Sequence, residues 1–262
     1  VAEQSKLSLP MSDWLVPLSD GLLEGLPAYW SDLRTWIICP HGPLLEVPWL
    51  ALIGPDHAPV IEQCAIQLVP YFAHLEPRRL ERDQPDLLSQ AVLLTGNAAD
   101  LVHLQGELEV LSHVLQPLGV VSGPPKGVAV HSWLEEVLPS ARILHFAGHG
   151  RFDPADPLAS TIETGTEKIT VGDFLAGRLQ GDHLELVTLA ACETARLQQG
   201  AASLVEGFLR ALLTTGTRSM LAGGWKVRDD ATALFMASCY QTLLPEGSLA
   251  EGVRAGCLAL RS

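Results

Sequence analysis

The segment ILHFAGHG, residues 143–150, decides the fold class of this chain. Its apolar run ends abruptly at Gly148-His149-Gly150, as a buried strand of a parallel sheet ends at a loop. A second run of the same form, LVTLAA at residues 186–191, ends at Cys192. Two strand-like segments therefore end at residues suited to nucleophilic chemistry, and we ask whether they share one site.

Strand and helix patterns alternate around these two segments. Amphipathic spacing, a Ser203–Glu206 capping box and Gly216 at a C-cap position predict a helix over residues 203–216. The alternation predicts an α/β fold, a mostly parallel sheet with helices on both faces. Strands are expected at 90–97, 142–147, 184–191 and 218–224, and further helices at 105–119, 127–140, 229–247 and 248–260.

The first third of the chain is less regular. Short helices are expected before residue 34, and the apolar runs 35–40 and 44–52 around His41-Gly42 predict a hairpin. Residues 65–71 form a third strand candidate. We therefore expect an N-terminal helical and hairpin lobe, residues 1–89, packed on a catalytic core, residues 90–262. Residues 150–173 and 193–203 are expected to be long loops beside the site.

Composition excludes several classes of function. The net charge of −13 argues against nucleic acid or an anionic membrane as a partner, since both attract basic patches. No apolar stretch of about 18 residues occurs, so no membrane span is expected. The five cysteines form no C-x-x-C pair, which disfavours disulfides and zinc and fits a reducing cytoplasm.

Neighbouring parallel strands would bring His149 and Cys192 to one crevice, since ligands bind outside the carboxyl ends of such strands. An imidazole can activate a thiol for attack on a carbonyl carbon, and the amides of Gly150 and Cys192 could hold the oxyanion. The alternative is that Cys192 is a small buried apolar residue. A metal pair of His145 and His149 is disfavoured, because four residues of strand span about 13 Å.

Several motifs resemble those of the CHAT domain family, bacterial cysteine peptidases similar to caspases and separases. LHFAGHGRFDPADPLAS and LVTLAACETA carry His149 and Cys192, which match the family's catalytic dyad. The other matching segments are CPHGPLLEVPWLALIG (39–54) and RSMLAGGWKVRDDATALFMASCYQTLL (218–244). Departures are Val47 for a usual Leu, Gly148 for a common Thr, and Gly223-Gly224 for a Ser-Leu step.

The resemblance implies a caspase-like fold with a pseudo-caspase-like N-terminal lobe, and peptide-bond hydrolysis without metal or cofactor. Such domains are usually fused to a controlling module. The start without Met therefore suggests an excised domain, or a regulatory activator protein on a separate chain. The expected partner in the site is a protein or peptide. A non-catalytic scaffold and a thiol amidase acting on small molecules remain as alternatives.

The segment WKVRDD, residues 225–230, is similar to a separase segment in which an Asp receives a basic side chain. Asp229 is the matching position, with Asp230 beside it and Trp225 at the start of the segment. The resemblance implies cleavage after Arg or Lys. Either Asp is also a natural N-cap for the helix that follows, and the two roles are compatible.

Overall fold

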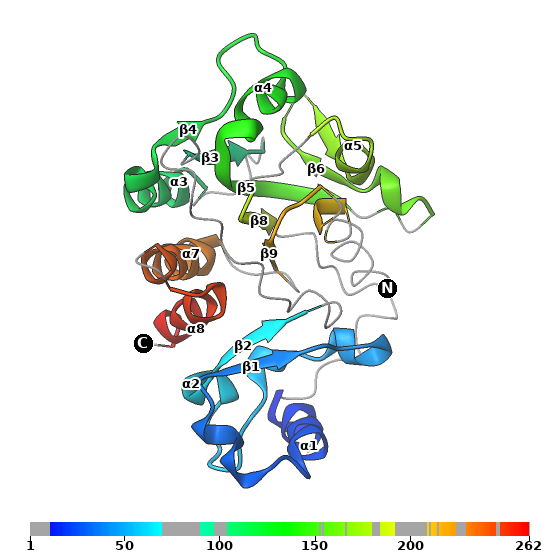
Figure 1. Cartoon of the computed structure of the whole chain (residues 1–262). Helices are drawn as coiled ribbons and strands as arrows, with labels where there is room; N and C mark the ends of the chain where they lie inside the picture. Colours follow the sequence, from blue (N-terminus) through cyan, green and yellow to red (C-terminus); the bar gives the residue numbers. More distant parts are fainter. Residues whose placement is uncertain are drawn as a thin grey trace, which may run out of the picture. The chain divides into compact units, whose positions relative to one another are not determined.

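The computed structural model divides the chain into two compact units, shown in Figure 1. The terminal unit comprises Val1–Arg78 with Ser238–Ser262, and the central unit comprises Arg79–Ala237. The structure describes residues 11–69, 90–96, 104–151, 153, 155–165, 167–179, 184–191, 209, 211–213, 215–223, 229–244 and 247–261.

A parallel sheet forms the centre of the central unit (Figure 1). Each strand pairs in parallel with its neighbours, as the apolar runs predicted. Strand β5 (Ala141–Arg151) lies in the middle, and its residues Leu144 and Phe146 are buried. In spatial order the strands are β4 (Val120–Ser122), β3 (Gln90–Thr95), β5 (Ala141–Arg151), β8 (Leu186–Ala191) and β9 (Ser219–Ala222).

Helices connect the parallel strands and flank the sheet. Helix α3 (Leu104–Val114) and the 3-10 turn η5 (Gln116–Leu118) precede β4, and α4 (Val130–Val137) with η6 (Leu138–Ser140) precedes β5. In α4 the buried residues Val130, Trp133 and Leu134 have helical spacing and join the core of the sheet. The predicted mostly parallel α/β fold flanked by helices is confirmed.

The loop expected at residues 150–173 is wrong in one respect, because it contains a hairpin over residues 161–170. Strand β5 continues to Arg151 and pairs antiparallel with β6 (Thr161–Glu163), which pairs with β7 (Lys168–Thr170). The turn η7 (Pro157–Ala159) precedes β6, and α5 (Val171–Leu175) follows β7. Ile162 and Ile169 are buried in the core. Strands of three residues are too short to show the alternation by which a strand is predicted.

The predicted C-cap at Gly216 is confirmed. Gly216 has φ 92°, a conformation in which glycine carries no side-chain penalty. Its amide donates to the Leu213 carbonyl at 3.3 Å, and the Thr217 amide donates to the Leu212 carbonyl at 3.0 Å. These two bonds are those of a Schellman motif. The Ser203–Glu206 capping box lies outside the described residues.

The hairpin predicted in the terminal unit does not form. Strand β1 (Thr35–Ile38) pairs in parallel with β2 (Ala65–Leu68), the third strand candidate. The run at 44–52 instead forms the 3-10 turns η2 (Gly42–Glu46) and η3 (Trp49–Ala51). Pro43 lies at the start of η2 and Pro48 at the N-cap of η3. Proline has no amide hydrogen for a strand ladder, which disfavours the hairpin.

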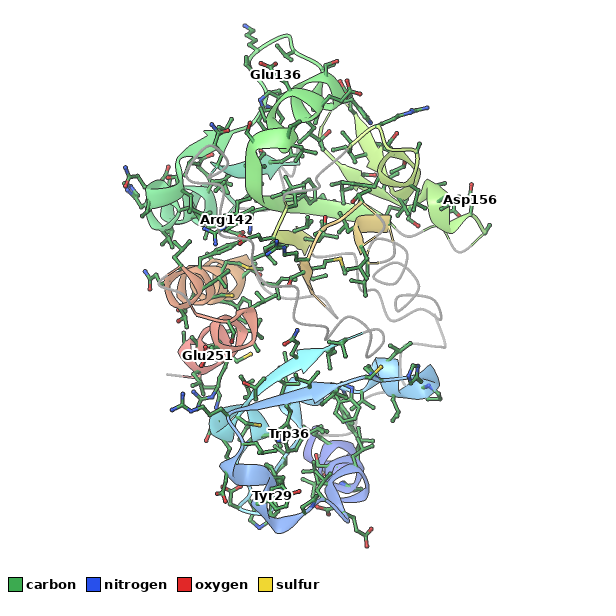
Figure 2. All side chains as sticks on the ribbon, in the orientation of Figure 1. Tyr29, Trp36, Glu136, Arg142, Asp156 and Glu251 are labelled. Atoms are coloured by element: carbon green, nitrogen blue, oxygen red, sulfur yellow. The ribbon has the colours of Figure 1, made fainter. Side chains whose placement is uncertain are left out.

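The terminal unit has its own apolar core, to which both ends of the chain contribute. Trp30 and Trp36 meet edge to face with ring centroids 4.9 Å apart; Figure 2 labels Trp36. Cys257 packs against the same cluster from the last helix. The helices of this unit are α1 (Met11–Leu23), η1 (Ala28–Asp32), α2 (Val60–Gln63), the end of α7 (Asp229–Leu243), and α8 (Leu249–Ala259).

Arg254 of helix α8 donates hydrogen bonds to two backbone carbonyls of α2. Arg254 donates from Nε to the Ile61 carbonyl at 2.9 Å and from Nη2 to the Glu62 carbonyl at 2.5 Å. The contacts thus group the C-terminal helix with N-terminal residues. The boundary expected at residues 89 and 90 stays a prediction, because residues 70–89 lie outside the described ranges. In the described part of the chain, no helix has the length and apolar character needed to cross a bilayer.

Candidate active site

Strand β5 carries His149 at the point where its neighbours change. Up to Ala147 it pairs with β3 and up to Gly148 with β8, both in parallel. From His149 to Arg151 it pairs antiparallel with β6, and His149 lies opposite Glu163. His149 is half-buried. The imidazole therefore stands at the carboxyl edge of the parallel sheet, as expected for a site residue in this fold class.

The pairing of β5 with β8 includes the residues that directly precede the two predicted dyad members. Gly148, the residue before His149, pairs with Ala191, the last residue of β8. Ala191 directly precedes Cys192 in the sequence. Cys192 itself lies outside the residues that the structure describes. The paired residues nevertheless bring the two strand ends together as the sequence predicted.

Two glycines allow three strands to converge beside His149. The Gly96 amide, just after β3, donates to the Ala147 carbonyl at 2.9 Å. A Cβ on Gly148 would lie 3.0 Å from the Gly96 Cα and 2.9 Å from Cζ of Phe146. A Cβ on Gly96 would overlap the Glu163 carbonyl oxygen of β6. At position 148, where the resemblance suggests Thr, a side chain would therefore be crowded by Gly96 and Phe146.

A buried histidine of β5, four residues before His149, contacts a buried carboxyl group of α3. His145 Nε2 is 3.4 Å from Glu107 Oε1, with side-chain exposures of 0% and 6%. Thr188, paired with His145 on β8, is also buried. Residues four apart on a strand share a face, so these polar groups lie along the same face as His149. The sequence analysis missed Glu107, although it lies one helical turn before the buried Leu111 on the inward side of α3.

The other predicted site residues are described only in part. Gly150 is buried and lies opposite Ile162 in the β5–β6 ladder. Asp229 and Asp230 are the first two residues of α7, where the helix dipole favours carboxylates. Their side chains and all of Trp225 lie outside the described part of the structure. The oxyanion and substrate-binding roles of these residues stay predictions.

Three of the four described cysteines, Cys64, Cys239 and Cys257, differ from a reactive thiol. Burial raises the pKa of Cys64, against the opposing charge of Arg254, and burial also raises the pKa of Cys257. Burial, helped by Cys257, raises the pKa of Cys239 to about 12. Such thiols are poor nucleophiles at neutral pH. Cys39 is half-buried, and its Sγ lies 3.5 Å from His41 Nε2.

Metal ligands do not gather in the described part of the molecule. No group of three or more His, Cys, Asp or Glu side chains there is arranged to hold an ion. The described arrangement at the edge of the sheet offers an imidazole, which suits proton transfer.

The chain resembles a solved cysteine proteinase in fold. The crystal structure of the Arg-specific cysteine proteinase gingipain R matches it with a TM-score of 0.58 and 13% sequence identity. The match covers 93% of this chain but 61% of gingipain R, so the chain spans less than two thirds of that protein. At this identity the likeness concerns the fold alone. It defines the class: a caspase-like α/β fold, as found in cysteine proteinases.

A comparison with protein-family models identifies the family of the chain. The CHAT domain model matches residues 13–262, nearly the whole sequence. The chain belongs to the CHAT domain family, and the resemblance seen in its motifs is confirmed. No curated protein matches the sequence.

Proposed function

We propose that the chain is a cysteine endopeptidase that cleaves a protein substrate with Cys192 as nucleophile and His149 as general base and acid. The observation that supports this most is the pairing of Gly148 with Ala191, the residues that precede the two dyad members. Membership of the CHAT family and the caspase-like fold point the same way.

The proposed chemistry needs no group beyond the chain, the peptide and water. The Cys192 thiol gives its proton to His149, and the sulfur attacks the scissile carbonyl carbon. Amides of Gly150 and Cys192 stabilise the oxyanion. His149 then protonates the leaving amine, the C–N bond breaks, and a thioester remains. Water, deprotonated by His149, attacks the thioester and releases the carboxylate product and the Cys192 thiol.

The first test compares wild type with Cys192→Ala and His149→Ala on a positional-scanning peptide library. Both variants are expected to lose cleavage by about a thousandfold or more, with unchanged circular dichroism, because triad-like groups act as a unit. Cleavage retained by Cys192→Ala would refute the proposal. No cleavage by wild type in any activating condition would favour the non-catalytic scaffold, and turnover of small amides alone would favour the amidase.

A second test measures the reactivity of the Cys192 thiol without a substrate. Iodoacetamide at pH 7, followed by peptide mass spectrometry, is expected to label Cys192 faster than the buried Cys64 and Cys239. His149→Ala should slow labelling of Cys192 and leave Cys39 unchanged as the internal control. Equal slowing at both cysteines would indicate a general effect of the substitution. Unchanged labelling of Cys192 would mean that His149 does not activate it.

We further propose that the enzyme cleaves after Arg or Lys, with Asp229 as the anion of the pocket and Asp230 and Trp225 nearby. A carboxylate in a partly desolvated pocket holds a guanidinium bidentately, more strongly than an exposed ion pair does. An Arg-specific enzyme with this fold exists in gingipain R, so the fold is compatible with such a pocket.

The Asp229→Asn variant separates substrate binding from helix capping, since Asn caps as well as Asp without its charge. Cleavage of Arg substrates is expected to fall about a hundredfold, while the melting temperature barely moves. Asp230→Asn is the matched control, one position along the same helix. If only the control loses activity, the two residues exchange roles; if neither does, the pocket lies elsewhere.

We also propose that a regulatory domain or a separate activator protein controls the site. The proposal depends on the family and on residues 193–203, the expected loop after Cys192. Residues 150–173, the other expected loop beside the site, contain a hairpin anchored in the core. Casein, an unstructured protein, is a suitable probe. The purified chain is expected to leave it intact, and rapid cleavage without any partner would contradict this regulation.

A further inference from the structure

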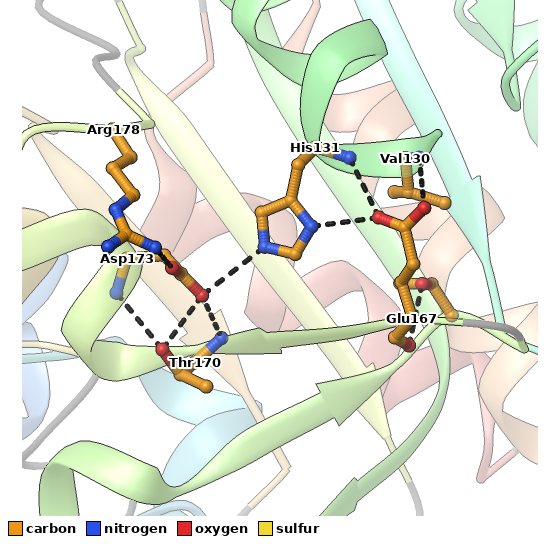
Figure 3. Close-up of polar contacts among 7 residues, drawn as sticks. Val130, His131, Glu167, Thr170, Asp173 and Arg178 are labelled. Carbon is orange, nitrogen blue, oxygen red and sulfur yellow. Dashed lines mark hydrogen bonds and ion pairs between the residues drawn. The ribbon is translucent and has the colours of Figure 1, made fainter. Parts of the chain in front are cut away.

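The Glu167 carboxylate links the turn between β6 and β7 to helix α4 through hydrogen bonds (Figure 3). Glu167 accepts from the backbone amides of Val130 and His131, through Oε1 and Oε2, at 3.1 Å each. These are two of the amides at the start of a helix that have no partner within it. Glu167, 36 residues away from His131 in sequence, thus caps α4 in place of a local N-cap side chain.

The His131 ring lies between two carboxylates. Its Nδ1 is 2.8 Å from Glu167 Oε2, and its Nε2 is 3.4 Å from Asp173 Oδ2, as Figure 3 shows. Asp173 caps α5 by accepting from the amide and hydroxyl of Thr170 at 2.8 and 2.7 Å. The ring therefore joins the N-terminus of α4 to the turn before β7 and to the N-terminus of α5.

The turn that carries Glu167 is continuous with β6, the strand that pairs with β5 from His149 to Arg151. Thr164 donates from its amide and its hydroxyl to the Glu167 carbonyl at 3.0 and 2.9 Å, which closes the turn. Its neighbour Glu163 is the residue opposite His149 in the β5–β6 ladder. Within the described residues, β6 is the ladder partner of β5 from His149 onward. A shift of the turn is thus carried directly to the backbone of His149.

Other charges near the ring leave this arrangement intact. Arg178 Nη1 contacts the second oxygen of Asp173 at 3.3 Å, and its side chain is mostly exposed. Lys168 contacts Glu163 at 3.9 Å. Glu135 lies one turn further along α4 and is exposed. The positive end of the α4 dipole disfavours a cation, so the two carboxylates are what make a charged ring favourable at this position.

Protonation of the ring is favoured by its partners. Burial opposes the charged form, but hydrogen bonds to Glu167 and then Asp173 outweigh it and raise the pKa of His131 above its ordinary value. The bond from His131 lowers the pKa of Glu167. A protonated ring donates to both carboxylates, whereas a neutral ring has one N–H and turns a bare nitrogen toward the other carboxylate.

We propose that His131 and Glu167 form a protonation-dependent clasp that holds the β6–β7 hairpin against α4 and thereby positions His149. His131 and Glu167 are positioning residues, because they act through the hairpin and not on substrate. The clasp rests on the proposed function only in that His149 is the catalytic base. Ile162 and Ile169 bury the hairpin in the core, so the clasp tightens the turn and does not release the strand.

The sign of the pH dependence follows from the raised pKa of His131. A group whose pKa is higher in the folded state stabilises that state fully below its unfolded pKa, near 6.5 for His. This contribution is lost as the pH rises through the folded pKa of His131. The clasp is therefore tightest below about pH 6.5 and weakens as the pH rises through the folded pKa of His131.

Hydrogen exchange of the full chain without substrate tests the clasp. Protection factors at residues 149–151 and 161–163, corrected for the intrinsic pH dependence of exchange, are expected to fall about two- to fivefold between pH 6 and pH 8 in wild type. This is the size of one partly exposed ion pair. Glu167→Gln and His131→Gln should show low protection throughout, with no such fall. Glu136→Gln removes a carboxylate from the exposed side of α4 and should behave as wild type.

Two results would overturn the clasp: the same fall with pH in His131→Gln as in wild type, or equal protection in Glu167→Gln and Glu136→Gln. The readout needs no cleavage, so failure of the dyad proposal leaves the test valid. Where peptide cleavage is observed, kcat of Glu167→Gln should also fall severalfold relative to Glu136→Gln, and KM should change little.

Discussion

At the scale of single residues, the close approach of β3, β5 and β6 depends on Gly96. Because a Cβ there would overlap the Glu163 carbonyl oxygen, Gly96→Ala must displace backbone that cannot yield as a flexible side chain does. We expect a loss of about 1–3 kcal/mol in the free energy of unfolding, the range seen for overpacked sites. Urea unfolding followed by circular dichroism measures it.

The control is Gly106→Ala in α3. A Cβ at Gly106 meets nothing within 4 Å, so the same chemical change is sterically free. Ala is the better helix former, and we expect a gain of about 0.5–1 kcal/mol. Loss of stability in both variants to the same extent would show that the approach of Gly96 to β6 is not the cause.

At the scale of elements, Arg254 joins α8 to the last carbonyls of α2. Arg254→Gln removes hydrogen bonds from a charged donor to two partly buried acceptors, and we expect the unfolding free energy to fall by about 1–3 kcal/mol. Arg261→Gln is the matched comparison, since Arg261 contacts the Glu62 side chain at 2.7 Å in a half-exposed pair. Its expected cost is below about 1 kcal/mol. Thermal melts of the two variants should rank in that order.

A second prediction at this scale concerns the start of α5 and the stability of the fold at acid pH. Burial opposes the lowered pKa of Asp173, but the bonds from the Thr170 amide and hydroxyl and from His131 prevail. A depressed carboxyl pKa stabilises the fold above the unfolded value, near 3.9, and this is lost as the pH falls through the folded value. Wild type should therefore lose stability more steeply below pH 4 than Asp173→Asn does. Parallel curves in urea titrations would mean that this carboxylate does not contribute.

At the scale of the whole molecule, the terminal unit is assembled from both ends of the chain. Removing residues 248–262 takes away Arg254 and Cys257, which contact α2 and the apolar cluster around it. We expect hydrogen exchange at residues 60–68 to become rapid. Residues 141–148 of β5, in the central unit, serve as the internal control and should stay protected. Equal loss in both segments would contradict the division into two units.

Local patterns were sufficient for much of the fold. The strands β3, β5, β8 and β9 and the helices α3, α4, α7 and α8 lie where apolar runs, helical spacing and caps predicted them. The C-cap at Gly216 is encoded in neighbouring residues and was readable for that reason. His149 likewise follows a strand whose end is marked by glycines. Such features depend on residues close in sequence, whose preferences act locally.

Pairing between distant segments could be settled only in three dimensions. The partner of β1 is β2, and the hairpin expected from two neighbouring runs fails because Pro43 and Pro48 cannot join a ladder. The β6–β7 strands are too short for a visible period. Their position is determined by the burial of Ile162 and Ile169, which depends on the whole core.

The candidate site likewise has features that local sequence predicts and features that only tertiary packing determines. Residue types and strand ends were enough to predict that the residues before His149 and Cys192 lie at one edge of the sheet, because parallel strands direct their carboxyl ends to one edge. The T-x-x-D pattern at Thr170–Asp173 is a readable signal for the cap of α5 that the sequence analysis missed. Three contacts join residues that are 36 to 67 positions apart in the sequence: His131 with Glu167, Glu107 with His145, and Gly96 with the Glu163 carbonyl. No local preference encodes such contacts, and the packing of the sheet alone decides them.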